Sequence, residues 1–375
     1  MMTLMNEPFN DFFSVAKSFV KANDQLLLIY DDHKGEVILQ SESFTLKQPA
    51  NGTVSGAGFI VDARKAHQIV SSLKSPSITT EVLGNWVTLS SGQSRYKIQR
   101  MSARKPIHAD QIFDSQFSLR PEDIRVLEGM SRCANQHDFR QAMQSVIIES
   151  RDNYLSFITT NGHVLVVGER ENTGTVFTSP LVMSKHLPGG MNKMIGHNNE
   201  LIVHMNPNII KLESGAKRAF LPRLCTAVPN WRPFLKLPYE SMGLAPEHLQ
   251  RNCKLAMSVV DKEETKNKLT IPVRMTAVDE TLVLELTSDI KHFDELLLAE
   301  IDSTDSTSST ISIEAPGISD FTLVVNPIYL SEALSHLESQ SKAREISIYL
   351  NKNEQLLRLQ SDQNLNYFIK VRLKR

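Results

Sequence analysis

Cysteine is scarce in this chain, and long apolar runs are missing from its 375 residues. The three cysteines, Cys133, Cys225 and Cys253, stand far apart without a C-x-x-C pair, which argues against a disulfide framework or a zinc knuckle. No apolar run reaches the roughly 18 residues of a membrane span, and residues 1–10 lack the basic and apolar regions of a signal peptide. We therefore expect a cytoplasmic protein that does not use a membrane.

An excess of either charge is missing as well. The chain has 41 lysines and arginines against 42 aspartates and glutamates, a formal net charge of -1. Any binding to nucleic acid must therefore come from positive charge that is gathered on one face. The hydrophobic content of 41% and the charged content of 22% suit ordinary globular cores, and this length corresponds to roughly two to four domains.

Motifs of catalysis and metal binding are not found in the sequence. It contains no phosphate loop, no G-x-S-x-G, no H-E-x-x-H and no dense cluster of acids. Its 11 histidines are scattered, which is not the pattern of a metal site. His137, Asp138 and His163 could suggest acid–base chemistry and Cys133 a nucleophile, but no catalytic motif surrounds them. We expect no catalysis, no metal and no cofactor.

What the chain does have is an internal repeat. Segments with apolar residues at helical spacing are each followed by the same order of strand, strand, turn and strand. These helix-like segments are residues 62–75, 184–196 and 326–339. The turn before the last strand is Ser91-Gly92 in the first copy, Ser214-Gly215 in the second and Ser361-Asp362 in the third.

A second repeated helix lies upstream of each of these segments. Pro121-Glu122 and Pro246-Glu247 both read as helix starts, and Glu7-Pro8 looks like a shortened copy. The pattern predicts an α+β chain of three repeated domains, residues 1–114, 115–239 and 240–375. Each domain would hold two helices packed on antiparallel sheets.

The stretch from Thr160 to Leu165 places Asn161-Gly162 between two apolar strands. Both turn residues tolerate a positive φ, so the pattern predicts a hairpin corner. By turn chemistry alone, His163 is an ordinary turn histidine.

Six motifs in one order give the chain a resemblance to a known family. They are Ala63-Arg64-Lys65, Ser91 to Tyr96, Asp138-Phe139-Arg140, Thr160 to Leu165, Pro229-Asn230-Trp231-Arg232, and Tyr367 with Val371-Arg372-Leu373. Together with the repeat, they resemble the bacterial β sliding clamp, the processivity subunit of DNA polymerase III. The resemblance is weakest over the first 50 residues.

The resemblance implies a head-to-tail homodimeric ring with helices around the hole and sheets outside. It also implies a non-catalytic role: encircling duplex DNA without reading its sequence, and tethering a DNA polymerase catalytic subunit, a clamp loader and other proteins with clamp-binding motifs. The helix residues that would face DNA are Lys21, Lys65, Arg132, His137, Lys185 and Lys193. The ring interface would join Arg95, Tyr96 and Ile98 of one copy to Val259 and Val260 of the other.

The resemblance further implies a hydrophobic pocket between the second and third domains for a short extended peptide that carries a Gln and a Leu-Phe-type pair. Its residues would be Met143, Thr160, Gly162, His163, Val164, Leu165, Pro229, Pro233, Phe234, Phe368, Ile369 and Val371. Val164 and Pro233 stand where the family usually has arginines, and the tail lacks two methionines. We therefore expect peptides with acidic or carbonyl contacts at these positions to bind less well than to an ordinary clamp.

Plainer interpretations exist for each feature. Met143, Leu165 and Phe368 could be ordinary core residues, the lysines a solvated helix face, and the interface strands ordinary buried strands. At the level of the whole chain, the alternative is a clamp-fold regulator or decoy that binds clamp-binding peptides without being loaded on DNA. A stable dimer favours the ring, whereas a monomer favours the regulator.

Overall fold

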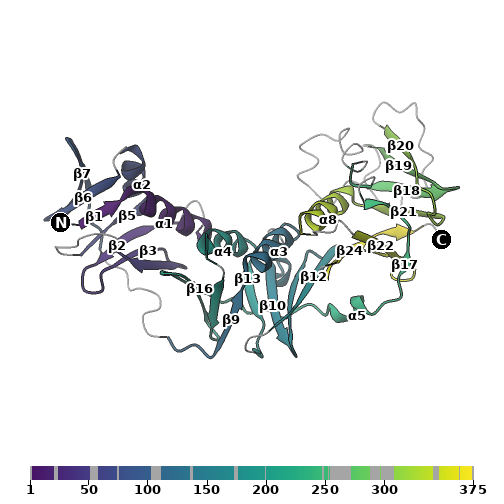
Figure 1. The fold of residues 1–375 in the computed structure, drawn as a ribbon, viewed down its shortest axis with the longest axis horizontal. Coiled ribbons are helices and arrows are strands. Elements are labelled where there is room, and N and C mark those ends of the chain that lie inside the picture. Colours follow the sequence, from purple (N-terminus) through teal and green to yellow (C-terminus); the bar gives the residue numbers. More distant parts are fainter. Residues whose placement is uncertain are drawn as a thin grey trace. The chain divides into compact units, whose positions relative to one another are not determined.

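The computed structural model describes residues 2–20, 24–50, 58–73, 76–102, 111–135, 138–172, 176–198, 200–246, 249–251, 253, 272–287, 296, 308–340, 346–362 and 364–373. These residues belong to two compact units. The first comprises residues 1–128 and 173–225, and the second comprises residues 129–172 and 226–375. Figure 1 shows both as helices packed on antiparallel sheets.

The main sheet of the first unit has eight antiparallel strands in the order β5-β2-β3-β4-β16-β15-β14-β9. Their bounds are β2 (Leu27–Asp31), β3 (Glu36–Gln40), β4 (Thr45–Pro49), β5 (Phe59–Asp62), β9 (Ser115–Leu119), β14 (Leu201–Met205), β15 (Ile209–Ser214) and β16 (Lys217–Pro222). The sheet is continuous because β4 pairs with β16, where Leu46 lies opposite Ala219. We call this pairing of two successive repeats the first junction.

A smaller sheet of the first unit has the order β1-β6-β7-β8. Its strands are β1 (Met2–Met5), β6 (Ser77–Leu83), β7 (Trp86–Ser91) and β8 (Ser94–Gln99). Strand β8 lies at the edge, and only Ile98 of its residues is buried. A further short strand, β13 (Leu181–Ser184), is bridged through Val182 to Leu224.

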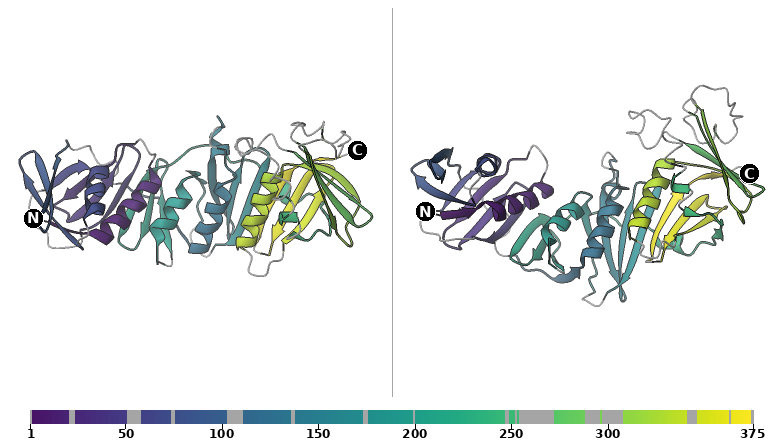
Figure 2. Two further views of the ribbon diagram at one scale, coloured as in Figure 1. Left: turned by 90° about the horizontal axis from the view of Figure 1, so that it is seen from above. Right: turned by 45° about the horizontal axis from the view of Figure 1, so that its top comes forward.

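Helices α1 (Asn6–Phe19), α2 (Ala63–Ser72) and α4 (Leu187–Ile195) lie on one face of the main sheet (Figures 1 and 2). Helix α2 begins after Asp62, whose carboxylate accepts a hydrogen bond from the backbone N–H of Lys65 at 2.9 Å. The buried side chains of α1 include Phe12 and Val15, and burial of each such side chain contributes about 1.5–3 kcal/mol. Helix α3 (Pro121–Ser131) carries the chain from the first unit into the second.

The second unit repeats this architecture. One sheet contains the order β10-β11-β12-β24-β23-β22-β17. The bounds are β10 (Ser145–Arg151), β11 (Tyr154–Thr160), β12 (Val164–Glu171), β17 (Glu240–Ser241), β22 (Ile346–Asn351), β23 (Leu356–Ser361) and β24 (Leu365–Lys370). The pairing of β12 with β24 puts Val166 opposite Tyr367, just as Leu46 lies opposite Ala219 in the first unit. We call it the second junction.

The other sheet of the second unit has five strands in the order β20-β19-β18-β21-β25. They are β18 (Val273–Val278), β19 (Thr281–Thr287), β20 (Ser308–Glu314), β21 (Phe321–Val325) and β25 (Arg372–Leu373). Strand β20 lies at one edge of this sheet. Because β25 pairs with β21, Arg372 and Leu373 are part of the sheet.

Among the described residues, the second unit also contains the short helices η1 (Gln141–Gln144) and α5 (Arg232–Leu235) and the longer helix α8 (Pro327–Gln340). Helix α8 packs on β23 and β24. Its buried His336 contacts Tyr367, and a Cβ added to Gly129 would lie 1.9 Å from the Nε2 atom of His336. Glycine is required there because the imidazole ring lies directly against the backbone of α3.

The α+β class and the repeat predicted from the sequence are confirmed. The helices predicted at residues 62–75, 184–196 and 326–339 are α2, α4 and α8. The division into domains 1–114, 115–239 and 240–375 stays a prediction. Within the described residues, no helix is long and apolar enough to cross a membrane.

Candidate functional site

The turn that joins β11 to β12 is held by its own side chains. The Thr160 hydroxyl donates to the Val164 carbonyl at 2.7 Å and accepts from the Gly162 N–H at 3.1 Å. The Asn161 side-chain oxygen accepts from the N–H groups of His163 and Val164 at 2.9 and 2.8 Å. Gly162 adopts a φ of 88°, which favours glycine. The turn is therefore held in one conformation, and His163 is an exposed residue of it.

The C-terminal strand lies against this turn. Val164 is opposite Ile369 and Leu165 is opposite Phe368. The Lys370 N–H donates to the His163 carbonyl at 2.9 Å. The structure thus brings together two of the predicted pocket segments, although they are distant in the sequence.

The third predicted segment, residues 229–234, is tied to the same sheet. The indole N–H of Trp231 donates to Glu149 on β10 at 3.0 Å, and Arg232 forms an ion pair with that carboxylate at 2.9 Å. The ring of Phe234 then lies 6.0 Å from the ring of Phe368. Tyr239 lies on the same Phe368 ring at 6.1 Å and donates its hydroxyl to the Phe234 carbonyl at 3.0 Å.

Met143 reaches the site through η1. Its N–H donates to the Arg140 carbonyl at 3.0 Å, and its own carbonyl accepts from Asn135 at 2.8 Å. The Arg140 guanidinium lies near the turn, with Nη2 3.6 Å from the place a Cβ would take on Gly162. Asp138 holds the guanidinium at 2.7 and 2.9 Å, and these side-chain hydrogen bonds lower the pKa of Asp138 to about 2.

His163 lies in a positive environment. Partial burial lowers the pKa of its imidazole, and the charges of Lys370 and Arg140 lower that pKa further. Its ring is stacked on Tyr329 at 6.5 Å, and the Asn161 side chain lies near the Tyr329 hydroxyl. Burial raises the pKa of Tyr329 to about 12. The imidazole is therefore mostly neutral near pH 7, so it is available as a hydrogen-bonding group.

The predicted pocket residues separate into a buried floor and an open rim. Thr160, Val164, Leu165, Phe368, Ile369 and Val371 are buried. Gly162, His163 and Pro233 are exposed, whereas Met143, Pro229 and Phe234 are half-buried. We call the exposed and half-buried residues the His163 surface. Its composition, with apolar rings beside a few polar groups, suits recognition of a short peptide.

Sequence reasoning missed two cations at this surface. It counted the arginines replaced by Val164 and Pro233 as lost charge, but Arg140 and Lys370 both lie close enough to lower the pKa of His163. Arg140 belongs to a motif that was noticed, twenty residues before Thr160, so its spacing could have revealed it. Lys370 gave no such signal, because only strand pairing places it beside the turn.

The candidate DNA-facing residues lie on or beside helices. Lys65 on α2, Lys193 on α4 and Arg132 after α3 are exposed, and Lys185 before α4 is half-buried. Lys21 and His137 lie outside the described residues. No cluster of three metal-ligating side chains occurs in the part of the chain that the structure describes.

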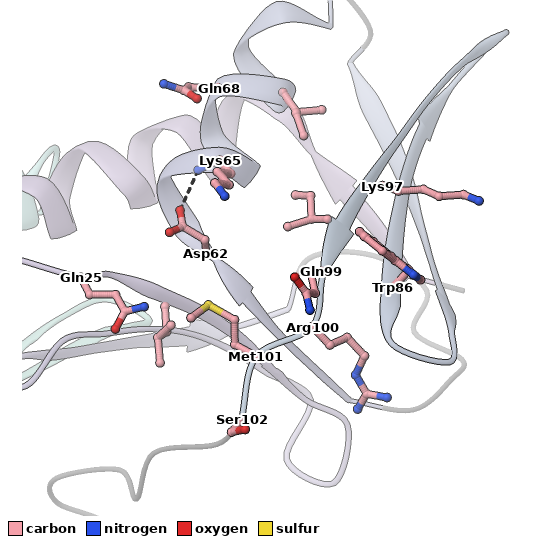
Figure 3. A pocket seen from close by; sticks show the side chains of 13 residues that line it. Gln25, Asp62, Lys65, Gln68, Trp86, Lys97, Gln99, Arg100, Met101 and Ser102 are labelled. Atoms are coloured by element: carbon pink, nitrogen blue, oxygen red, sulfur yellow. Dashed lines mark hydrogen bonds between the residues drawn. The ribbon is translucent and has the colours of Figure 1, made fainter.

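One of the candidate interface residues, Ile98, lines a cavity of about 1040 Å³ beside β8. Arg95 and Tyr96 are exposed, and Ile98 is buried in the wall of the cavity. Figure 3 shows Lys65 of α2 on one side and Lys97 and Arg100, on and just beyond β8, on the other. Val259 and Val260 lie outside the described residues.

Comparison with known proteins finds similarity in structure but not in sequence. No protein-family model and no curated protein matches the sequence. Among solved structures, the DNA polymerase III beta subunit of Thermotoga maritima superposes with a TM-score of 0.79 at 14% identity, covering 100% of this chain and 99% of that one. The corresponding subunit of Pseudomonas aeruginosa gives 0.80 at 13% identity, with the same coverage.

A third similar structure is the beta clamp of Helicobacter pylori bound to a DNA ligase peptide, with a TM-score of 0.78 and 14% identity. It covers 100% of this chain and 99% of that chain. The chain therefore has the fold of the sliding clamps over its whole length. At this identity the likeness establishes the fold alone.

Proposed function

We propose that this chain is a DNA sliding clamp, a non-catalytic processivity factor of the cytoplasm. Two copies close head to tail into a ring around duplex DNA. The ring tethers a DNA polymerase catalytic subunit and other replication or repair proteins through short peptides, and a clamp loader places it on DNA. The observation that carries the proposal is a pair of open sheet edges that match each other.

The match follows from the repeat. Strand β4 pairs with β16 at the first junction, and β12 pairs with β24 at the second. The strand orders show which strands occupy the same position in each repeat. Strand β20 is equivalent to β4 and β12, and β8 is equivalent to β16 and β24. Within the described residues, β8 and β20 are both left at sheet edges. Two copies that pair β8 with β20 would satisfy both edges by closing a ring.

The cavity beside β8 supports the same assembly. At the first junction, the end of α1 supplies Phe19 and Val20 to the equivalent place between α4 and β16. The sequence Ala16-Lys17-Ser18-Phe19-Val20 is matched in the third repeat by Ala256-Met257-Ser258-Val259-Val260. The cavity beside β8 would therefore receive Val259 and Val260 from the second copy, with Ile69 and Ile98 as apolar partners.

The mass of the protein in solution tests this assembly. We expect the wild type to be a dimer at micromolar concentration. The double substitution Val259→Glu and Val260→Glu should give monomers, because two carboxylates would be desolvated without partners. The matched control is Val278→Glu, an exposed valine of β18 that should leave the dimer intact. A double variant with unchanged mass in light scattering contradicts the proposed interface.

Binding to DNA would use charge without base recognition. The candidate contacts are Lys65 on α2 and Lys193 on α4, with Lys185 and Arg132 just beside α4 and α3. Contacts of this kind are sequence-independent and weaken with salt. The protein alone should therefore bind linear duplex weakly, and durable association should need a closed ring.

Partner binding would use the His163 surface. The Helicobacter pylori clamp binds a DNA ligase peptide, and this chain shares its fold. Here Phe234 stands over the buried Phe368, with His163 beside them as a hydrogen-bonding group. Such peptides bury only a few side chains, so affinities should be micromolar, roughly -7 to -8 kcal/mol. A monomer that still binds these peptides would favour the regulator or decoy instead.

A further inference from the structure

A second cavity lies at the first junction, away from β8. Its volume is about 570 Å³, within the range of small-molecule sites. Apolar side chains from three parts of the first unit form most of its lining: Phe19, Val20, Met183, Leu187, Leu221, Pro222 and Leu224. Asp24, Ser43 and His186 add polar groups.

The second junction shows what fills the equivalent space there. Val182 is bridged to Leu224 in the first unit, and Val324 pairs with Arg372 in the second. Counting on from these valines, Leu187 corresponds to Tyr329. The turns can be matched in the same way. Thr45 pairs with Phe220 as Leu165 pairs with Phe368, so Thr45 corresponds to Leu165. Counting back from these two residues, Ser41 corresponds to Asn161 and Ser43 to His163.

At the second junction these larger side chains close the space. Tyr329 is only 6% exposed, its ring is stacked on His163, and the Asn161 side chain lies near its hydroxyl. At the first junction each of them is replaced by a smaller residue. The space of a phenol ring and its partners is therefore left open.

Neighbouring side chains are not free to fill this space. The ring of Phe19 lies against α4, where a Cβ on Gly190 would be 2.6 Å from it, and it is stacked on Phe44 at 5.0 Å. The adjoining turn also carries an unused polar group. The hydroxyl of Ser41, which is 4% exposed, has no hydrogen-bond partner among the described residues. Ser41 itself does not line the cavity, whereas Ser43 of the same turn does.

We propose that the cavity at the first junction binds a phenol-type group, an aromatic ring that carries a hydroxyl. The ring occupies the apolar space that Tyr329 occupies at the second junction. The hydroxyl hydrogen-bonds Ser43, the residue of the turn that lines the cavity. Release of water from apolar walls drives the ring into the cavity, and the hydroxyl sets its orientation. This inference does not depend on ring formation or on DNA binding.

The test uses p-cresol as the probe and full-length protein labelled with ¹³C at its methionine methyl groups. We expect a saturable shift of the Met183 methyl signal, because Met183 lines the cavity. Leu187→Tyr should weaken p-cresol binding roughly tenfold or more, since the new side chain takes the ligand's place. Ser43→His, at an exposed position, should weaken it as well without disturbing the core.

The reciprocal variant is the sharpest control. Tyr329→Leu should open the same space at the second junction and add a second saturable site, with shifts of the His163 ring signals. N-acetyltyrosine amide identifies the source of the phenol: tighter binding than p-cresol indicates a tyrosine on a partner chain, and weaker binding indicates a free phenol. The proposal is overturned if the Met183 signal shows no saturable shift up to about 20 mM p-cresol, the scale that a ligand of this size reaches. Equal binding by the Leu187→Tyr variant or by toluene also overturns it.

Discussion

At the scale of single residues, Phe234 is the more exposed ring of the Phe234–Phe368 pair at the His163 surface. It is half-buried, whereas the Phe368 ring beneath it is 1% exposed. Phe234→Ala should weaken a fluorescent clamp-binding peptide by about 1–3 kcal/mol, because truncating an anchoring aromatic removes buried contact area. Lys236→Ala, an exposed change just after the same helix, is the matched control and should leave affinity unchanged. Equal affinities of the wild type and Phe234→Ala would mean that the peptide site lies elsewhere.

His336 should make stability depend on pH. Burial, with the charge of Arg132 as a smaller cause, lowers the pKa of His336 from 6.5 to about 4. Between about pH 6.5 and pH 4, His336 is therefore protonated in the unfolded chain but neutral in the folded chain. The free energy of unfolding falls as the pH falls through this window. Between about pH 7 and pH 5, this site alone should cost about 2 kcal/mol.

Urea unfolding of His336→Gln checks that prediction. The variant should lose less free energy of unfolding than the wild type over the same pH interval, because glutamine does not titrate. Its stability near pH 7 is a separate quantity, since the hydrogen bond to Tyr367 also changes. An unchanged pH dependence in the variant would show that His336 titrates normally in the folded state.

The sequence predicted which residues gather at the candidate site better than it predicted their charge. Convergence of the turn, the 229–234 segment and the C-terminal strand was expected, and the structure brings all of them to one sheet. The positions of Arg140 and Lys370 were not expected at the His163 surface. Side-chain placement of this kind depends on pairing between strands that are distant in the sequence, which periodicity cannot reveal.

At the scale of secondary-structure elements, the contact between α1 and α4 depends on one glycine. A Cβ on Gly190 would lie 2.6 Å from the ring of Phe19, which is itself stacked on Phe44. Gly190→Ala should therefore destabilise the protein by about 1–3 kcal/mol through overpacking.

The preceding glycine is the matched control for this change. A Cβ on Gly189 would be 3.7 Å from Glu128, an ordinary contact, and alanine favours helices. Gly189→Ala should thus change the free energy of unfolding by less than about 1 kcal/mol, or increase it. Equal effects of the two substitutions in thermal unfolding would mean that Phe19 can move away from α4.

The elements themselves were predictable, whereas their junctions were not. Apolar periodicity and turn pairs placed α2, α4 and α8 and the hairpins after them. The pairings of Leu46 with Ala219 and of Val166 with Tyr367 join different repeats. Their register is set by tertiary packing and leaves no local signal in either strand. For the same reason, the cavity at Leu187 could not be predicted from the sequence.

At the scale of the whole molecule, the repeat supports the proposal that two copies of the chain form a ring. Two junctions inside the chain are built by one pairing scheme, and the described edges β8 and β20 offer the same scheme to a second copy. Clamp structures superpose on the full length of the chain at a TM-score near 0.8, although identity is only about 14%. The same architecture is therefore compatible with very different side chains.

Topological retention on DNA tests the central claim most directly. A tagged copy would be recovered, with a small circular plasmid, from the cell that encodes it and washed in about 0.5 M salt, where contacts to phosphate are weak. A closed ring predicts that the intact circle stays bound and that a single cut by a restriction enzyme releases it. Lys185→Glu with Lys193→Glu should reduce the recovered plasmid, and Val259→Glu with Val260→Glu should abolish recovery. Failure to retain the circle, or equal retention of circular and cut DNA, would contradict the proposal that this chain encircles DNA.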